Sequence, residues 1–288
     1  MPEQGGDDGL AFSGWMRTLP ALRKENTVNR IMLLADLGNT TVKFRAAGLE
    51  GLLGRTQSAP THDPVQWDSA ARRALRDAGC DPQHPESGPW PELLAAASVV
   101  PGREGNLRAL AAQLGLLCLL APHQLRLNIE NRYAKPREVG ADRLTVAYAA
   151  RRTFGAERLI VLDFGTATTF DCVRGEAYLG GLICPGVRSS IRSFTEDTAQ
   201  LPRPSLEVDP AGLHIGISTM DSLNQGVVYG FAAMTEGLVQ RLEKALGGES
   251  LVVATGGYAE IIAPVCPAIH EVRQDLVLEG LRLAALDS

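Results

Sequence analysis

The sequence predicts an α/β protein made of two similar halves that face each other across a central cleft. The main observation is a repeated pattern, in which an apolar run ends in Asp-x-Gly and is followed by hydroxyl and amide residues. The first copy covers residues 33–41 and the second covers residues 161–169, nearly half a chain further on. One Asp-x-Gly turn is typical of an ordinary hairpin, but two copies at this spacing indicate a duplicated nucleotide-binding core.

Each copy of the pattern is expected to form a β-hairpin with its chemistry at the turn. The continuous apolar run fits a strand that is buried on both faces. Gly38 and Gly165 allow the backbone to approach a ligand, and Asp36 and Asp163 offer carboxylates for a cation or its waters. A second strand follows each turn directly, which excludes the strand-to-helix turn of a Walker loop or a dinucleotide fingerprint. Short donors for phosphate oxygens follow the glycines: Asn39, Thr40, Thr41, Thr166, Thr168 and Thr169.

A third segment has a related pattern, because the apolar run 251–254 leads into Thr255-Gly256-Gly257 and then a helix from about residue 258. The free N–H groups at the start of that helix are suited to a phosphate or to the adenosine end of a nucleotide. The alternative is a close strand-to-helix crossing that requires glycine for steric reasons.

The two halves show the same order of elements, three strands followed by alternating helices and strands. In the first half we expect strands 32–36, 42–46 and 54–57, helix 64–78, strand 93–100, a helix ending near 114, strand 116–120 and helix 140–154. In the second half we expect a strand ending at 163, strands 170–173 and 177–183, helices 187–196 and 218–246, strand 251–254 with its helix, and helix 277–286. The halves are predicted to span 32–153 and 154–288, with the C-terminal helix able to pack back on the first, and ligands are expected between them.

Composition narrows the class of protein. The chain has 28 basic and 33 acidic residues, a net charge of −5, and no basic cluster interleaved with aromatics, so nucleic acid is not an expected partner. Five scattered cysteines without a C-x-x-C pair indicate reduced thiols in the cytoplasm, and five histidines show no metal-ligand spacing.

No apolar stretch reaches the roughly 18 residues of a membrane span. Residues 1–31 lack a signal-peptide pattern and are expected to be a disordered tail, with Met32 as a candidate alternative start.

Asp142 is the candidate catalytic carboxylate. It falls in the first turn of the helix expected over 140–154, where an aspartate can simply cap N–H groups and stabilise the helix by about 0.5–2 kcal/mol. The functional interpretation is a general base that accepts the proton of an acceptor hydroxyl as it attacks a γ-phosphate. Arg143 beside it could bind a carboxylate on that acceptor, or it could be a solvated charge on the helix face.

With these residues together, the chain resembles the type III pantothenate kinases, within the superfamily of acetate and sugar kinases, Hsp70 and actin. The resemblance extends over residues 32–288. It is carried by the segments 36–43 (DLGNTTVK), 133–143 (YAKPREVGADR), 163–171 (DFGTATTFD), 180–186 (GGLICPG), 198–202 (TAQLP) and 255–257 (TGG). The resemblance implies duplicated ribonuclease H-like, actin-like ATPase domains. It also implies ATP-dependent phosphorylation of pantothenate to 4′-phosphopantothenate, the first step towards coenzyme A.

The resemblance also implies roles for individual residues. Asp142 would be the base and Asp163 would hold a monovalent cation, potassium or ammonium. Apart from the resemblance, Asp171 is a further carboxylate after the second turn that could assist that cation or close the hairpin. ATP with Mg²⁺ would be contacted by Asp36, Leu37, Gly38, Asn39, Thr40, Thr41, Val42, Lys43 and Thr166. Pantothenate would be contacted by Tyr133, Gly140, Ala141, Asp142, Arg143 and Thr198. Members of this family are homodimers with the pantothenate pocket near the interface, so Thr198 could act across it.

Two other functions fit the same fold, since fold alone does not determine function. One is an ATP or polyphosphate hydrolase, which would need no pocket for an organic acceptor. The other is a non-catalytic nucleotide-binding regulator, an accessory factor for gene expression, which would be expected to lack the base. An actin-like filament protein is remote, because the chain is too short for the insertions that actin uses in polymer contacts. The presence of Asp142 and of all three phosphate-binding segments favours the kinase.

Overall fold

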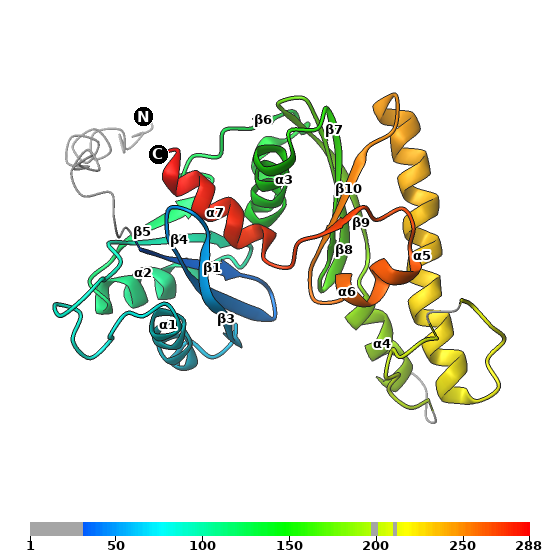
Figure 1. Ribbon diagram of the computed structural model, residues 1–288, viewed down its shortest axis with the longest axis horizontal. Coiled ribbons are helices and arrows are strands. Elements are labelled where there is room, and N and C mark those ends of the chain that lie inside the picture. Colours follow the sequence, from blue (N-terminus) through cyan, green and yellow to red (C-terminus); the bar gives the residue numbers. More distant parts are fainter. Residues whose placement is uncertain (1–30, 197–200, 210–211) are drawn as a thin grey trace, which may run out of the picture.

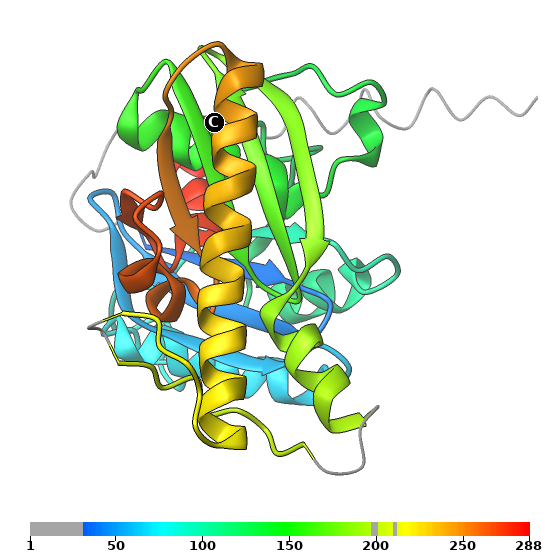
Figure 2. The same ribbon diagram turned by 90° about the vertical axis from the view of Figure 1, so that its right-hand side faces the viewer.

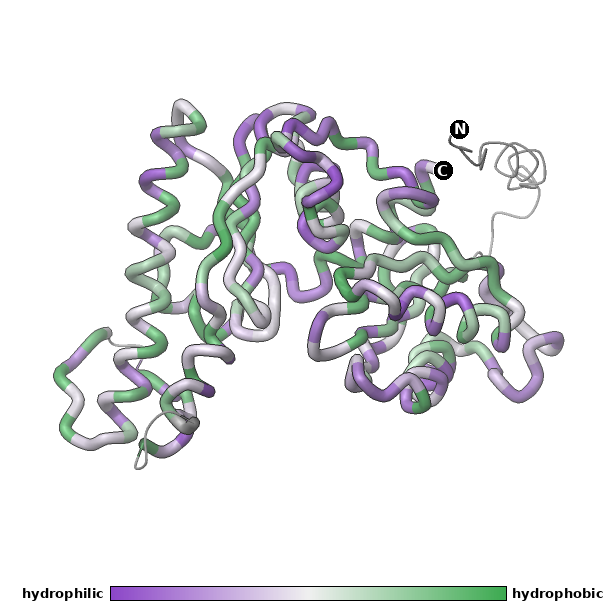
Figure 3. Tube along the Cα trace, turned by 180° about the vertical axis from the view of Figure 1, so that it is seen from behind, coloured by the Kyte–Doolittle hydropathy of each residue, from purple (hydrophilic) through white to green (hydrophobic). Residues whose placement is uncertain are grey.

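The computed structural model describes residues 31–196, 201–209 and 212–288, and it has the α/β architecture that the sequence predicts. Two mixed β-sheets stand beside each other, with helices between them and on both outer sides (Figure 1). Figure 3 shows hydrophobic residues along the central strands of both sheets, where the layers meet. None of the helices within the described ranges combines the length and apolar character needed to cross a lipid bilayer.

The first sheet has the strand order β3-β2-β1-β4-β5. Its strands are β1 (Met32–Leu37), β2 (Thr41–Ala47), β3 (Leu52–Pro60), β4 (Leu93–Ser98) and β5 (Leu117–Ala121). Strands β1 to β3 are antiparallel neighbours, whereas β4 and β5 continue the sheet in parallel. Helices α1 (Val65–Asp77) and α2 (Glu104–Gln113) cover the outer face and bury Trp67 and Leu107 against it.

The second sheet repeats this topology. Its strands are β6 (Glu130–Asn131), β7 (Arg158–Phe164), β8 (Ala167–Arg174), β9 (Ala177–Pro185), β10 (Leu251–Thr255) and β11 (Glu271–Val272). The order β11-β10-β7-β8-β9 matches that of the first sheet, with the short strand β6 added at the edge. The outer face is covered by α4 (Val187–Glu196), α5 (Thr219–Leu246) and α6 (Ala259–Ile262), and Figure 2 shows α5 running the length of this face.

Helices α3 (Ala141–Phe154) and α7 (Leu276–Leu286) form a middle layer between the sheets. Their apolar side chains share one core with Leu34 of the first sheet and Val161 of the second, so α3 is buried on nearly all sides. The two helices cross closely at Gly280, where a Cβ atom would lie 2.6 Å from the carbonyl oxygen of Thr145. Although α7 is the last element of the chain, it also packs on β1 and β4.

The alternation of side chains along β1 and β7 determines where their aspartates point. Leu34 faces the middle layer whereas Leu33 faces the outer helices, so Asp36 lies on the inner face of β1. Val161 likewise faces the middle layer, which places Asp163 on the inner face of β7. The two carboxylates therefore approach the space between the halves from opposite sides.

Most expected elements are present within three residues of their predicted ends, and both repeated patterns form the predicted hairpins. The helix expected after Gly257 is only the four-residue α6, followed by the 3-10 turn Ala263–Val265. The two-residue strands β6 and β11 and the 3-10 turn Pro136–Glu138 were not predicted, because such short elements have no periodicity of their own.

Candidate active site

The turns of the two hairpins meet in a cleft between the halves. The hydroxyl oxygens of Thr40 and Thr166 lie 3.3 Å apart although the residues are 126 positions apart in sequence. The cleft has a volume of about 580 Å³. It is lined by Asp36, Gly38, Asn39, Thr40, Thr41, Lys43, Val99, Asp142, Asp163, Phe164, Gly165, Thr166, Ala167, Thr169, Arg188, Arg203, Gly256, Gly257, Tyr258 and Val277. All three segments with a phosphate-binding pattern thus contribute to one cleft.

The first turn is fixed by hydrogen bonds at both ends. The N–H of Gly38 donates to the carbonyl of Thr41 (3.1 Å), and the hydroxyl of Thr61 donates to the carbonyl of Gly38 (2.7 Å). Thr61 was not predicted to be part of the site, since it lies beyond the repeated pattern. The side chains of Leu37 and Val42 are fully buried in the core, so a ligand in the cleft could contact only their main chain.

The second turn is packed against α4. A Cβ at Gly186 would lie 2.1 Å from the carbonyl oxygen of Thr166, so only glycine allows this approach. The hydroxyl of Ser189 donates to the same carbonyl at 2.9 Å. These contacts hold the first turn of α4 at the second hairpin, which brings Arg188 to the wall of the cleft.

Gly256 brings the end of β10 directly against Asp163. Its φ is +89°, and a Cβ there would lie 2.3 Å from Oδ1 of Asp163 and 2.7 Å from the backbone of Phe164. The close crossing that the sequence left open is therefore present, and Gly256 and Gly257 also line the cleft.

Three carboxylates share the cleft with Lys43, which pairs across the strands with Asp36. Burial raises the pKa of Asp36 to about 6, while Lys43 lowers it and Asp142 raises it. Burial also raises the pKa of Asp163 to about 7, with a further contribution from the charge of Asp36. Burial is also the main reason why the pKa of Asp142 is raised. This part of the cleft holds more negative charge than Lys43 alone can balance, which suits a cation.

Asp163→Asn is expected to stabilise the ligand-free protein in a pH-dependent way. The pKa of Asp163 in the folded protein is about 7, above the ordinary value of about 4 expected in the unfolded chain. Between these two pH values the folded protein keeps Asp163 protonated whereas the unfolded chain does not, so the folded protein loses stability as pH rises from about 4 to 7. The variant should therefore gain on the order of 2 kcal/mol in unfolding free energy at pH 8. Its gain should be much smaller near pH 4. Denaturant unfolding at both pH values measures this.

The matched control for this prediction is Glu50→Gln, which removes a carboxylate from an exposed position. Its unfolding free energy should follow that of the natural chain at both pH values. A gain in Asp163→Asn that is equal at pH 4 and pH 8 would contradict the burial of a charged Asp163.

Asp142 lies at the start of α3 and faces the cleft. One of its carboxylate oxygens accepts from the N–H of Arg143 at 2.7 Å, and it caps no N–H group further along the helix. A Cβ at Gly140 would lie 2.5 Å from that oxygen, so the glycine before the helix leaves room for the carboxylate. A single hydrogen bond, from the N–H of Arg143, thus supports the interpretation of Asp142 as a helix cap.

Arg143 forms a buried ion pair with Asp171. Its Nε donates to Oδ1 of Asp171 at 2.8 Å, and its Nη2 lies 2.7 Å from the same oxygen without an aligned hydrogen bond. The hydroxyls of Tyr178 (2.9 Å) and Thr169 (3.1 Å) also donate to Asp171. Burial raises the pKa of Asp171 to about 6, and Arg143 opposes that shift.

This network corrects two interpretations. Arg143 is not a solvated charge on a helix face, because its side chain is only 10% exposed. Asp171 does not close the second hairpin, because it lies in the interior of β8 and faces α3. Alternation along β8 places Asp171 on the inner face with Val173, a signal that the sequence contained.

Tyr133 lies next to this network. Its ring centroid is 6.5 Å from that of Tyr178, and Gly180, with φ of +106°, leaves space for its ring. Of the predicted substrate residues, only Asp142 lines the cleft described above, while Tyr133, Gly140, Ala141 and Arg143 lie outside its lining. Thr198 falls outside the described residues. Arg188, Arg203 and Tyr258 line the cleft although the sequence analysis did not select them.

Comparison with solved structures supports the fold. A Baf family transcriptional activator from Campylobacter jejuni matches with a TM-score of 0.57 at 18% identity, covering 88% of this chain and 98% of that one. A ROK family glucokinase from Streptomyces griseus, solved with glucose and AMPPNP, matches with a TM-score of 0.53 at 15% identity, covering 90% and 100%. These neighbours confirm the predicted actin-like ATPase fold.

Comparison with known sequences identifies the family. Residues 32–241 match the family model described as type III pantothenate kinase. The type III pantothenate kinase of Nitratidesulfovibrio vulgaris (strain Miyazaki F) is 48% identical over 260 residues, covering 88% of this chain and 97% of the relative. That of Thermus thermophilus is 36% identical over 257 residues, covering 87% and 97%. The chain therefore belongs to the type III pantothenate kinase family, whose activity is the phosphorylation of pantothenate in the coenzyme A pathway.

Proposed function

We propose that Asp142 is the general base of this reaction and accepts the proton of the primary hydroxyl of pantothenate as that oxygen attacks the γ-phosphate of ATP. The observation that carries the proposal is the position of Asp142 in the cleft formed by both Asp-x-Gly turns. Burial raises the pKa of Asp142 towards neutral pH, which favours its action as a base. The proton moves from the pantothenate oxygen to the carboxylate as the new oxygen–phosphorus bond forms and the bond to ADP breaks.

ATP would occupy the cleft with its phosphates between the two turns. Lys43 provides a positive charge, and the N–H groups around Gly38 and Gly165 can donate to phosphate oxygens. Other donors in the lining are Asn39, Thr40, Thr41 and Thr166. Leu37 and Val42 would contribute only through their main chain.

The carboxylates of the cleft fit cations that accompany ATP. Asp36 and Asp163 could hold Mg²⁺ or its waters, and Asp163 could hold a monovalent cation. Mg²⁺ bound there with ATP would supply charge neutralisation at the phosphates. Within the described ranges, no three His, Cys, Asp or Glu side chains form a ligand set for one metal ion. Phosphate oxygens and water would complete the coordination.

Pantothenate would bind beside Asp142, on the side where Arg143 and Tyr133 lie. Arg143 is held by Asp171 through Nε and Nη2, and we propose that the rest of its guanidinium donates to the substrate carboxylate. Gly140, Ala141 and Thr198 complete the proposed contacts.

Potassium or ammonium is expected to raise the rate of phosphorylation relative to sodium. Asp163 is buried next to the second turn, where a weakly hydrated monovalent cation could balance its charge against the triphosphate. The test is ADP release with saturating Mg²⁺, ATP and pantothenate in chloride salts of each ion at equal ionic strength. Equal rates in the three salts would overturn the assignment of a monovalent cation to Asp163.

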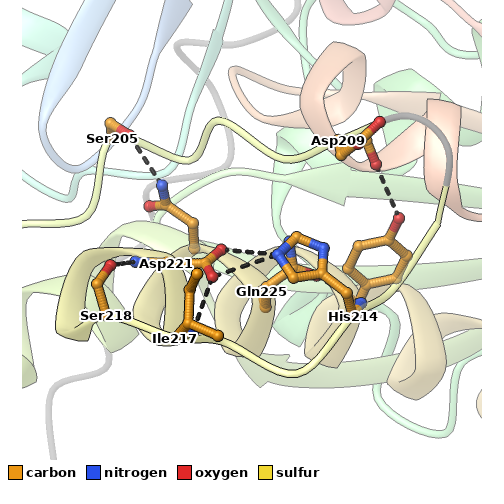
Figure 4. Close-up of polar contacts among 9 residues, drawn as sticks. Ser205, Asp209, His214, Ile217, Ser218, Asp221 and Gln225 are labelled. Atoms are coloured by element: carbon orange, nitrogen blue, oxygen red, sulfur yellow. Dashed lines mark hydrogen bonds and ion pairs between the residues drawn. The ribbon is translucent and has the colours of Figure 1, made fainter.

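The protein is also proposed to form a homodimer through residues 212–218, which directly precede α5. Figure 4 shows how this segment is attached: Asp221 accepts from the N–H of Ile217 (3.0 Å) and contacts Nε2 of His214 (3.1 Å). Asn224 donates to the hydroxyl of Ser205 at 2.9 Å. The polar groups thus face α5, while the side chains of Ile215 and Ile217 are 90% and 94% exposed. Two exposed isoleucines, separated by one glycine, support a protein interface.

Ile215→Asp with Ile217→Asp is expected to convert the dimer to a monomer, because two charges would be buried in an apolar contact. Sedimentation equilibrium measures the mass. Val65→Asp is the control, since Val65 is 85% exposed on α1 of the other half, and it should leave the mass unchanged. A double variant with the mass of the natural chain would reject this surface as the interface.

A further inference from the structure

The charges on the two sides of the cleft are unequal if only the repeated hairpins are counted. The first hairpin contributes Lys43 beside its turn, whereas the corresponding part of the second hairpin, residues 163–170, contains no lysine or arginine. A triphosphate carries several negative charges, and three carboxylates already lie in the cleft. A fixed positive charge on the second half would therefore be important for binding ATP.

The structure places such a charge at the start of α4. Arg188 is the second residue of this helix and lines the cleft. The helix is attached to the second turn by the Ser189 to Thr166 hydrogen bond of 2.9 Å and by the close packing of Gly186 on the same carbonyl. The N–H of Ser190 donates to the carbonyl of Gly186 at 2.9 Å, which closes the first helical turn. The position of Arg188 is thus determined by the second hairpin.

The side chain of Arg188 is available for a ligand. It is exposed, and within the described ranges it makes no hydrogen bond or ion pair with another residue. Arg203 also lines the cleft, but it lies in the irregular stretch 201–209. Within the described residues it makes no hydrogen bond to the second turn. Arg188 is therefore the better-anchored cation on this side.

We infer that Arg188 binds the β- and γ-phosphate region of ATP from the second half, opposite Lys43 on the first. A guanidinium presents parallel N–H groups that match phosphate oxygens bidentately, whereas a lysine acts as a point charge. With Lys43 on β2 and Arg188 on α4, one triphosphate would bridge both halves of the molecule. This inference rests on the proposed location of ATP in the cleft.

The test compares the binding of ATP and AMP, each with Mg²⁺, by calorimetry. Arg188→Met should weaken ATP about tenfold, because a charge-assisted contact to the outer phosphates is lost. It should change the affinity for AMP less than twofold, because AMP lacks those phosphates. Arg188→Lys should recover part of the ATP affinity. Arg192→Met is the matched control, since it removes the same charge one turn further along α4 and outside the lining of the cleft.

The outcomes separate this inference from the proposed function. ATP binding by Arg188→Met that equals that of Arg192→Met would overturn the role of Arg188 alone. Equal losses for ATP and AMP would also overturn it, because the effect would not come from the outer phosphates. Absence of ATP binding by the natural chain would overturn both the inference and the proposed location of ATP.

Discussion

Asp142→Asn is expected to lower kcat for pantothenate phosphorylation by about 10²- to 10⁴-fold, the range typical of a lost general base. Asparagine keeps the shape of the side chain but cannot accept the proton. The affinity for ATP should stay within a few-fold, because the hairpin donors and Lys43 are unchanged. In the natural chain kcat should rise with pH as Asp142 ionises, at a pH above that of an ordinary aspartate. That acidic limb should be absent in the variant.

The control is Glu138→Gln, which removes a carboxylate four residues earlier, at an exposed position where it pairs with Lys135. Its kcat should match that of the natural chain. Steady-state rates from pH 5 to 9, with calorimetric titration of ATP, provide both readouts. A kcat for Asp142→Asn within threefold of the natural value, or a loss confined to ATP affinity, would rule out the role of base.

Asp171→Ala is expected to destabilise the protein by about 3–5 kcal/mol, because it leaves the guanidinium of Arg143 buried without its partner. The change also removes the acceptor for the hydroxyls of Tyr178 and Thr169. Urea unfolding of the ligand-free protein measures the loss.

The double variant Arg143→Met with Asp171→Ala identifies the ion pair as the cause. It should be less destabilised than Asp171→Ala alone, because no unpaired charge remains in the core. If the loss of unfolding free energy in the double variant equals the sum of the losses in Arg143→Met and Asp171→Ala, the two residues are not coupled. In that case Asp171 would stabilise the fold through its hydroxyl partners.

The parts of the site that the sequence predicted are those encoded locally. Asp36 and Asp163 each follow an apolar run, and period-two alternation within that run sets the face on which the carboxylate lies. Gly38 and Gly165 mark the turns, and the repeated pattern relates the two sheets. These features need only a few neighbouring residues, so they could be recognised without knowledge of long-range packing.

The parts that were missed depend on contacts between distant segments. The pairing of Arg143 with Asp171 joins a helix to a strand 28 residues away, and either residue alone suggests a surface charge or a turn. Arg188 reaches the cleft only because Gly186 packs on Thr166. Such contacts follow from the arrangement of helices on sheets, which the periodicity of one segment does not specify.

The two alternative functions make different demands on the site. A non-catalytic regulator would not require Asp142 in the cleft, and the likeness to a Baf family transcriptional activator at 18% identity concerns the fold alone. A hydrolase would activate water and would not need the Arg143 and Tyr133 region beside Asp142. Membership of the type III pantothenate kinase family favours the kinase over both alternatives.

The most direct test of the proposed reaction is mass-spectrometric detection of 4′-phosphopantothenate after the full chain is incubated with ATP, Mg²⁺, potassium and pantothenate. We expect one phosphopantothenate for each ATP consumed, and ATP consumption that is negligible when pantothenate is omitted. ATP consumed at the same rate with and without pantothenate, or no product although ATP binds, would contradict the account of the cleft as a pantothenate kinase site.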